Sequence, residues 1–278
     1  MTAGVSIRRG FVVTGTGTDV GKTLVGTALL RALRSRGLKP GALKPFETGC
    51  VSQTLVQGAD HPDSDAGRLS RAAGLDPMRF LPGFFRAELP LAPYAARLAG
   101  AALPADTPAD HASASTLSLT RIESECIAFA ERFDVTLVEG AGGVAVPLTA
   151  QHTTLDFFTR LGWPLVLVAA DQLGTLSHTL TAVWALRSQH LPLLAVVLVC
   201  PPSAAIPTAE GLLQTAESAA DDPSRIHNAL ILREYLGPLP VFSVSGAELI
   251  ADVDGSALPA ALVDACAPQA PAVELPTR

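Results

Sequence analysis

The stretch Phe11-Val-Val-Thr-Gly-Thr-Gly-Thr-Asp-Val-Gly-Lys-Thr23 decides the fold of this chain. It joins a short apolar run to a glycine-rich turn and a Gly-Lys-Thr triplet, which is the order of a buried strand, a tight loop and the first turn of a helix. The backbone N–H groups of such a loop converge on phosphate oxygens at a helix N-terminus, where the helix dipole also favours negative charge. We therefore predict a phosphate-binding loop over residues 15–23, followed by a helix that begins near Lys22.

The residue types of this loop indicate a nucleoside triphosphate with magnesium. The Lys22 ammonium would reach the β and γ phosphates, and the Thr23 hydroxyl would be a magnesium ligand. A dinucleotide-binding turn is disfavoured, because the loop glycines are spaced one residue too far apart and Lys22 would have no purpose there. An accidental Gly-Lys-Thr in a glycine-rich turn is the remaining alternative. The loop residues that we expect to bind the nucleotide are Gly17, Thr18, Asp19, Val20, Gly21, Lys22 and Thr23.

The composition indicates a globular protein with a sizeable core. The chain has 278 residues, of which 48% are hydrophobic. Its net charge is −6, and its 20 Lys and Arg residues form no basic stripe that could neutralise a nucleic-acid backbone. Every apolar run is shorter than the roughly 18 residues of a membrane span. We expect neither nucleic acid nor a membrane among its partners.

The cysteines indicate a reducing compartment. Cys50, Cys126, Cys200 and Cys266 lie far apart and form no CxxC pair. This spacing suggests neither a zinc site nor a disulfide framework. We therefore expect reduced thiols in a cytoplasmic protein.

Short apolar runs of strand length recur along the chain without alternation, which is typical of strands covered on both faces. The runs lie at residues 11–13, 42–43, 135–138, 165–169, 193–199 and 241–244. Helical patterns at 23–36, 121–132, 175–190 and 226–235 separate several of them, and the first ends on Gly37, a favourable residue just past a helix. This alternation predicts a three-layer α/β/α P-loop NTPase fold with a mainly parallel sheet.

We predict one domain over residues 1–267. Residues 51–118 are rich in Pro, Gly, Ala and Asp, and we interpret them as an irregular excursion with short helices rather than a second domain. The tail at 268–278 contains Pro271 and Pro276 and is predicted to be disordered.

Two carboxylates and a lysine elsewhere in the chain complement the loop. Glu139 directly follows the apolar run 135–138, at the carboxyl end of a predicted strand, where open α/β sheets bind ligands. With Asp65 and Thr23 it would supply the oxygen ligands that magnesium prefers, whereas Asp63 is expected to cap the helix that starts there. Lys44 follows the second strand and, taken alone, would be a surface lysine.

The chain resembles the dethiobiotin synthetase family, whose loop Gly-Thr-x-Thr-x-Val-Gly-Lys-Thr is matched from Gly15 to Thr23. The related deviant Walker ATPases that partition DNA carry a second lysine where this chain has Gly17. The other segments similar to the family are Lys44-Pro-Phe-Glu-Thr-Gly49, Ser64-Asp-Ala66, Val138-Glu-Gly-Ala-Gly-Gly143 and Leu173-Gly-Thr-Leu-Ser-His178.

The resemblance implies roles for several of the matched residues. It implies that Lys44 and Lys22 are catalytic and lie against the transferring phosphate, and that Glu139 and Gly142 join the nucleotide site. It implies that Thr48, Gly174 and Thr175 contact the diamino substrate, and that the molecule is a homodimer with substrate between subunits. Cys200 replaces an asparagine that reads adenine in many members, and Ser177 replaces a second asparagine. A thiol cannot imitate the paired donor and acceptor of a carboxamide, so the base preference stays open.

The activity that the resemblance implies is ATP-dependent closure of the ureido ring of dethiobiotin, with ATP, CO2 and 7,8-diaminononanoate as substrates and Mg2+ as cofactor. The reaction would pass through a carbamate and a carbamic-phosphoric anhydride. The alternatives are a P-loop ATPase switch that binds a protein partner and a related cobyrinate-type synthetase. The latter usually needs a glutamine-hydrolysing domain, and little sequence follows residue 245 to form one.

Overall fold

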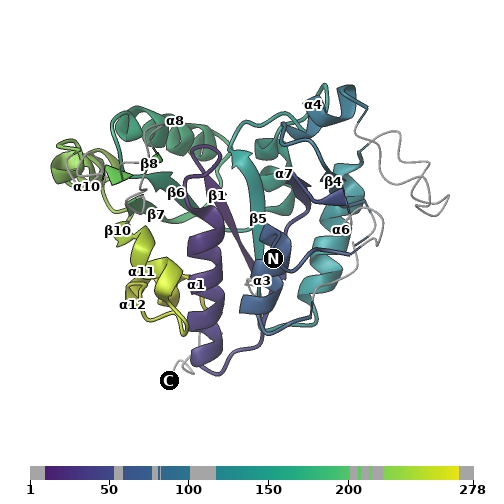
Figure 1. The fold of residues 1–278 in the computed structure, drawn as a ribbon, viewed down its shortest axis with the longest axis horizontal. Coiled ribbons are helices and arrows are strands. Elements are labelled where there is room, and N and C mark those ends of the chain that lie inside the picture. The colour runs from purple at the N-terminus through teal and green to yellow at the C-terminus, as the bar shows by residue number, and fades with distance from the viewer. Residues whose placement is uncertain are drawn as a thin grey trace, which may run out of the picture.

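A parallel six-stranded sheet in the order β10-β7-β6-β1-β5-β2 forms the centre of the computed structural model (Figure 1). The structure describes residues 10–52, 59–76, 81, 83–100, 117–200, 206–207, 213–214 and 222–268. The strands of the central sheet are β1 (Gly10–Gly15), β2 (Pro40–Leu43), β5 (Val135–Gly143), β6 (Leu165–Ala170), β7 (Leu193–Cys200) and β10 (Val241–Ser245). Each contains one of the apolar runs identified in the sequence, so the predicted strands are confirmed.

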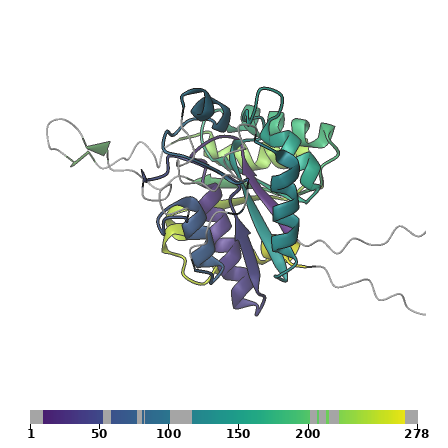
Figure 2. The ribbon, with the colours of Figure 1, turned by 90° about the vertical axis from the view of Figure 1, so that its right-hand side faces the viewer.

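Helices cover both faces of this sheet. One face packs on α6 (Leu119–Ala130), α7 (Thr154–Leu161), α8 (Thr175–Ser188) and α10 (Arg225–Leu236). The other packs on α1 (Lys22–Ser35), α3 (Asp65–Ala72), α11 (Gly246–Ala251) and α12 (Ala260–Cys266). Figures 1 and 2 show the resulting three layers from two sides. The predicted three-layer α/β/α fold is therefore confirmed.

The unalternating strands explain this layering. In β6 the side chains of Leu165 and Leu167 enter one hydrophobic cluster, while those of Val166 and Val168 enter the other. Successive side chains of a strand point to opposite faces, so a strand that is apolar at every position must be covered twice. The continuous apolar runs in the sequence thus dictate helices on both sides.

The strand order creates a crevice beside the phosphate loop. β1 pairs with β5 on one side and with β6 on the other, both in parallel. The chain therefore leaves β5 for the opposite side of β1, and in open α/β sheets ligands bind at the carboxyl ends of strands at such a switch point. The loop after β1 lies at this point.

The predicted excursion at 51–118 contains the short helices α3 and α4 (Pro93–Leu98) among its described residues, and its strand β4 (Phe85–Ala87) joins a small second sheet that the sequence did not suggest. β3 (Phe46–Thr48) pairs in parallel with β4, and α4 follows. The expected helix cap is wrong by one residue: Ser64, not Asp63, caps α3, because its hydroxyl accepts the N–H of Gly67.

Two further strands, β8 (Ile206–Pro207) and β9 (Leu213–Gln214), form an antiparallel pair. The tail predicted to be disordered lies outside the described residues from 269 onward. Within the described part of the chain, every helix is too short or too polar to cross a membrane.

Candidate functional site

The phosphate loop runs from the end of β1 to the first turn of α1. Gly21 is the N-cap residue of α1 and has φ of 98°, a left-handed conformation that favours glycine. A Cβ atom at Gly21 would also lie 3.1 Å from the methyl carbons of Val199. The buried Lys22 side chain turns back into the loop, where its Nζ donates to the Gly17 carbonyl oxygen at 2.6 Å. The predicted strand, loop and helix are therefore present, and the Lys22 ammonium occupies the loop in which we expect phosphate to bind.

Lys44 lies between two carboxylates at the carboxyl edge of the sheet. Its side chain is only 6% exposed, and Nζ lies 2.6 Å from Glu139 Oε1 and 2.5 Å from Asp65 Oδ2. The Thr23 hydroxyl donates to the same Glu139 oxygen at 3.0 Å, which links the cluster to the phosphate loop. The interpretation of Lys44 as a surface lysine is wrong.

The charges around the two lysines differ in effect. Burial lowers the pKa of Lys44, but the Glu139 and Asp65 carboxylates outweigh burial and hold that pKa above its ordinary value. Burial also lowers the pKa of Lys22, and here the more distant carboxylates do not compensate. Lys44 therefore remains cationic at neutral pH, whereas the charged form of Lys22 would gain from an anion in the loop.

The oxygen atoms near Thr23 suit a magnesium ion. Glu139 is fully buried, and its Oε2 has no hydrogen-bond partner. The Thr23 hydroxyl and the Asp65 carboxylate meet at Glu139 and Lys44: Thr23 donates to Glu139 Oε1, and Lys44 Nζ contacts both carboxylates. A buried carboxylate oxygen without a partner is costly, and a hard cation would satisfy it. Among the described residues, no three or more His, Cys, Asp or Glu side chains form a group that could hold a metal ion by themselves.

Glu139 does not end its strand, because β5 continues through the glycine-rich segment to Gly143. Val13 and Gly15 of β1 pair with Glu139 and Gly143 of β5, so the longer β5 segment bulges directly after Glu139. Gly142, with φ of 59°, lies in this bulge, and a Cβ atom there would sit 3.5 Å from the Thr18 hydroxyl. The structure thus brings Gly142 against the phosphate loop.

The three residues expected to contact the diamine lie on two separate elements. Thr48 ends β3 and is half-buried. Gly174 has φ of 93° and precedes α8, and Thr175 is buried with its hydroxyl 3.5 Å from that of Thr179. Exposed Ser177 and His178 follow in the first turn of α8. The structure does not bring these residues into the Lys44 cluster.

Cys200 ends β7 and is half-buried. Cys200 pairs with Ser245 of β10, and on the other side of β7 the N–H of Asp171, just past β6, donates to the Val199 carbonyl oxygen. The buried Asn228 side chain donates to Asp171 Oδ1 at 2.8 Å. A buried carboxylate and carboxamide therefore lie close to the position at which the sequence suggested a missing base contact.

Sequence reasoning missed a second group of buried charges behind Asp65. Glu47, Asp60 and Arg86 are all buried, and Arg86 is only 1% exposed. Arg86 Nε lies 2.8 Å from Asp60 Oδ1 and 3.7 Å from Glu47 Oε2. Glu47 stood inside a matched segment, three residues after Lys44, but a charged residue in a short run gives no signal that it is buried.

Several known proteins are similar to this chain. A family model described as an AAA domain matches residues 9–247. The ATP-dependent dethiobiotin synthetase BioD of Caulobacter sp. (strain K31) is 37% identical over 262 residues, which cover 93% of this chain and 96% of that protein. The ATP-dependent dethiobiotin synthetase BioD of Anaeromyxobacter dehalogenans (strain 2CP-C) is 41% identical over 192 residues, covering 68% of this chain and 76% of that protein. The cell division ATPase MinD of Pyrococcus furiosus is a more distant structural neighbour, with TM-score 0.43, 18% identity and coverage of 92% and 97%.

The sheet, the phosphate loop and the buried lysine between carboxylates define an ATP-dependent enzyme with the P-loop NTPase fold. The nearly full-length relative decides the family. The chain belongs to the dethiobiotin synthetase family. The family predicted from the loop, Lys44 and Glu139 is thereby confirmed.

Proposed function

We propose that this chain closes the ureido ring of dethiobiotin from 7,8-diaminononanoate, CO2 and ATP. The observation that carries the proposal is the buried Lys44, which lies between Asp65 and Glu139 and is joined through Thr23 to the phosphate loop. A cation held in this way next to a triphosphate suits a reaction that transfers the γ-phosphoryl group to an anionic acceptor. The two BioD relatives, which are ATP-dependent dethiobiotin synthetases, support the proposal by comparison.

The chemistry needs no side-chain nucleophile. One amine of the substrate adds to CO2 and loses a proton, which gives a carbamate. A carbamate oxygen attacks the γ-phosphorus while the bond to the ADP oxygen breaks, which gives a carbamic-phosphoric anhydride and ADP. The second amine then attacks the carbamoyl carbon, loses a proton and expels inorganic phosphate. The ring closes with one ATP consumed.

In this proposal the two lysines stabilise charge, while the loop positions the nucleotide. Lys22 would exchange its bond to the Gly17 carbonyl for the β and γ phosphates, which restores its charged form. Lys44 is already cationic and would face the oxygens of the transferring group. Residues 17–23, with Gly142 against Thr18, would surround the phosphates.

Thr23, Asp65 and Glu139 would hold magnesium. The unpartnered Glu139 Oε2 and the converging oxygens support this assignment. When bound, the ion neutralises charge on the β and γ phosphates. Lys44 contacts the same two carboxylates, so its ammonium and the ion would share their negative charge.

The remaining assignments rest on the family resemblance. Thr48, Gly174 and Thr175 would bind the diamine, with the segment after Gly174 serving the site of a second subunit in a homodimer. The single domain at 1–267, the cytoplasmic location and the absence of nucleic-acid and membrane partners belong to the same proposal. Because Cys200 replaces the asparagine that reads adenine in many members, the preference for a nucleotide base is to be measured.

The test is an assay of ADP, phosphate and dethiobiotin with magnesium, bicarbonate, 7,8-diaminononanoate and each of the four triphosphates. We expect phosphate release that requires both bicarbonate and the diamine and matches dethiobiotin formation one to one. Phosphate release at the same rate without the diamine would contradict the proposed function.

A further inference from the structure

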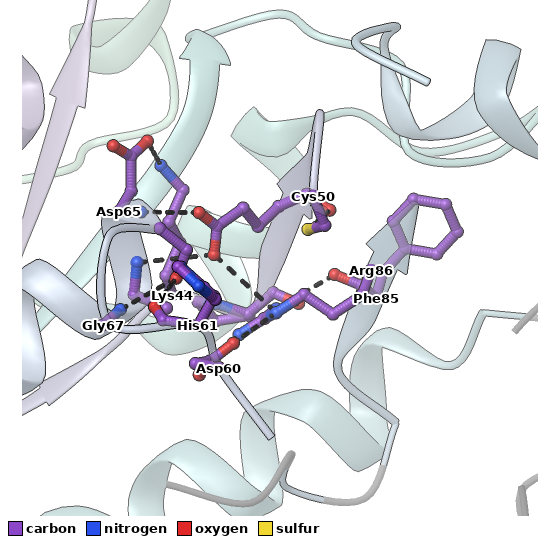
Figure 3. Close-up of polar contacts among 12 residues, drawn as sticks. Lys44, Cys50, Asp60, His61, Asp65, Gly67, Phe85 and Arg86 are labelled. Atoms are coloured by element: carbon purple, nitrogen blue, oxygen red, sulfur yellow. Dashed lines mark hydrogen bonds and ion pairs between the residues drawn. The ribbon is translucent and has the colours of Figure 1, made fainter. Parts of the chain in front are cut away.

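Glu47 contacts the backbone at the start of helix α3, where Asp65 is the first residue. One Glu47 oxygen accepts the N–H of Asp65 at 2.7 Å, and the other accepts the N–H of Ala66 at 3.4 Å. The Asp65 side chain meanwhile reaches Lys44, as Figure 3 shows. The segment 44–47 therefore holds Asp65 twice, once through its carboxylate and once through its backbone.

The bonds from Glu47 are not needed merely to start helix α3. Ser64 already caps this helix, because its hydroxyl accepts the N–H of Gly67 at 3.0 Å. A local cap such as Ser64 moves with the helix, whereas Glu47 belongs to another segment. Glu47 therefore fixes where the first turn of α3 lies relative to Lys44.

Glu47 is itself held from behind by Arg86. The two residues are direct partners in the register of β3 and β4. Arg86 forms a two-bond contact with Asp60, at 2.8 Å and 3.2 Å, and donates to the Phe85 carbonyl oxygen at 3.0 Å. Figure 3 shows the Arg86 side chain directed at Asp60. A planar guanidinium with several fixed partners gives Glu47 a rigid neighbour.

We propose that Glu47, held by Arg86, is a positioning residue that sets the distance between the Asp65 carboxylate and Lys44. The inference rests on the proposed function, in which Lys44 and Asp65 serve phosphoryl transfer. It also gives the small sheet a purpose: β3 and β4 hold a buried charged pair against the start of α3.

The catalytic test compares Glu47→Ala, Asp65→Ala and the double variant in steady-state ADP release. We expect Glu47→Ala to lower kcat about 10-fold to 100-fold, the scale of hydrogen bonds to a charged group, with the KM for nucleotide unchanged. In the Asp65→Ala background, the second substitution should lower kcat less than about 2-fold, because Glu47 acts through Asp65. Fully multiplied losses, or no loss in Glu47→Ala, would overturn the proposal.

Amide hydrogen exchange measured by NMR tests the geometry without any turnover. Glu47→Ala should speed exchange at Asp65 and Ala66 about 10-fold or more and leave Gly67 unchanged, since only the first two amides bond to Glu47. The matched control Ser64→Ala should do the reverse, and it should keep kcat. Unchanged exchange at Asp65 and Ala66 in Glu47→Ala overturns the proposal whatever the activity. A wild-type enzyme that forms no dethiobiotin defeats the proposed function instead, while the exchange pattern still decides the role of Glu47.

Discussion

Lys44 Nζ lies 2.6 Å from Glu139 Oε1, and neither side chain has appreciable contact with solvent. Burying an ion pair costs desolvation on both sides, so a pair of this kind contributes little to stability by itself. A functional reason for the pair is that it fixes a positive charge where we expect a phosphate to bind. The wider cluster ties it to the loop through Thr23 and to α3 through Asp65.

Replacing Lys44 should remove turnover and leave nucleotide binding. We expect Lys44→Met to lower kcat about 100-fold to 1,000-fold, because it removes a fixed positive charge from the transferring group. Lys39→Met is a matched control, since Lys39 stands in the same Leu-Lys-Pro context but is exposed at the other end of β2. Equal kcat values for the two variants would show that the charge of Lys44 does not serve catalysis.

Arg86 should matter far more for stability than an exposed arginine does. Arg86→Met would leave Asp60 and Glu47 buried without their cation, a change that typically costs about 3–5 kcal/mol. Arg71→Met is the control, because Arg71 lies 4.0 Å from Asp63 on the surface and such pairs contribute about 0–1 kcal/mol. Urea unfolding monitored by circular dichroism gives both values. Similar losses in the two variants would contradict the buried network.

Sequence patterns predicted the central sheet well and the small sheet not at all, for a physical reason. The six main strands are apolar on both faces and leave a continuous signature. Strands β3 and β4 have three residues each and carry Glu47 and Arg86 at their centres. Their burial depends on tertiary pairing of charges, which no local pattern records.

The candidate site divides in the same way. Thr23, Lys44, Asp65 and Glu139 each stood at a predicted strand end, loop or helix start, so their meeting could be anticipated from the topology. The buried state of Lys44 and the contribution of Glu47 could not, because both depend on how α3 packs against residues 44–47. The helix cap fell on Ser64 rather than Asp63 because Ser64 is the residue with extended φ and ψ before the first helical turn.

The pKa of Asp65 should lie below its ordinary value, and the pKa of Glu47 should lie above its ordinary value. Burial raises the pKa of both carboxyls, but the Lys44 charge lowers the pKa of Asp65 below 3.8. For Glu47 burial prevails over Arg86 and Lys44, so its pKa lies above 4.5. Carbon-13 NMR titration, with Asp65→Asn and Glu47→Gln for assignment, should find the Asp65 midpoint below 3.8 and the Glu47 midpoint above 4.5. Midpoints in the reverse order would contradict the arrangement.

The depressed pKa of Asp65 also has a consequence for stability. A carboxyl whose pKa is lowered on folding stabilises the folded state above its unfolded pKa, and this stabilisation is lost as the pH falls through the folded pKa. We expect the loss of stability in Asp65→Asn to be present at pH 7 and to shrink below pH 3.8. Urea unfolding at several pH values measures it, and a difference that grows toward acid would count against the pairing with Lys44.

The conformation of Gly21 should be required for nucleotide binding. Gly21→Ala would combine the strain of positive φ with a contact at 3.1 Å to Val199, so we expect about 10-fold weaker nucleotide binding by calorimetry. Gly37→Ala is the matched control, because Gly37 also has positive φ but nothing lies within 4 Å of its added Cβ. The control should lose stability and keep its affinity. Equal affinities in both variants would show that the loop tolerates the change.

The most direct test of the proposed ring closure follows an oxygen atom. If a carbamate oxygen attacks the γ-phosphorus, CO2 labelled with oxygen-18 and used before it exchanges with water should deliver one labelled oxygen to each released phosphate. Mass spectrometry of the phosphate measures this transfer, with a reaction lacking the diamine as the control. We expect label in the phosphate only when the diamine is present, and phosphate whose one new oxygen comes from water would contradict the mechanism.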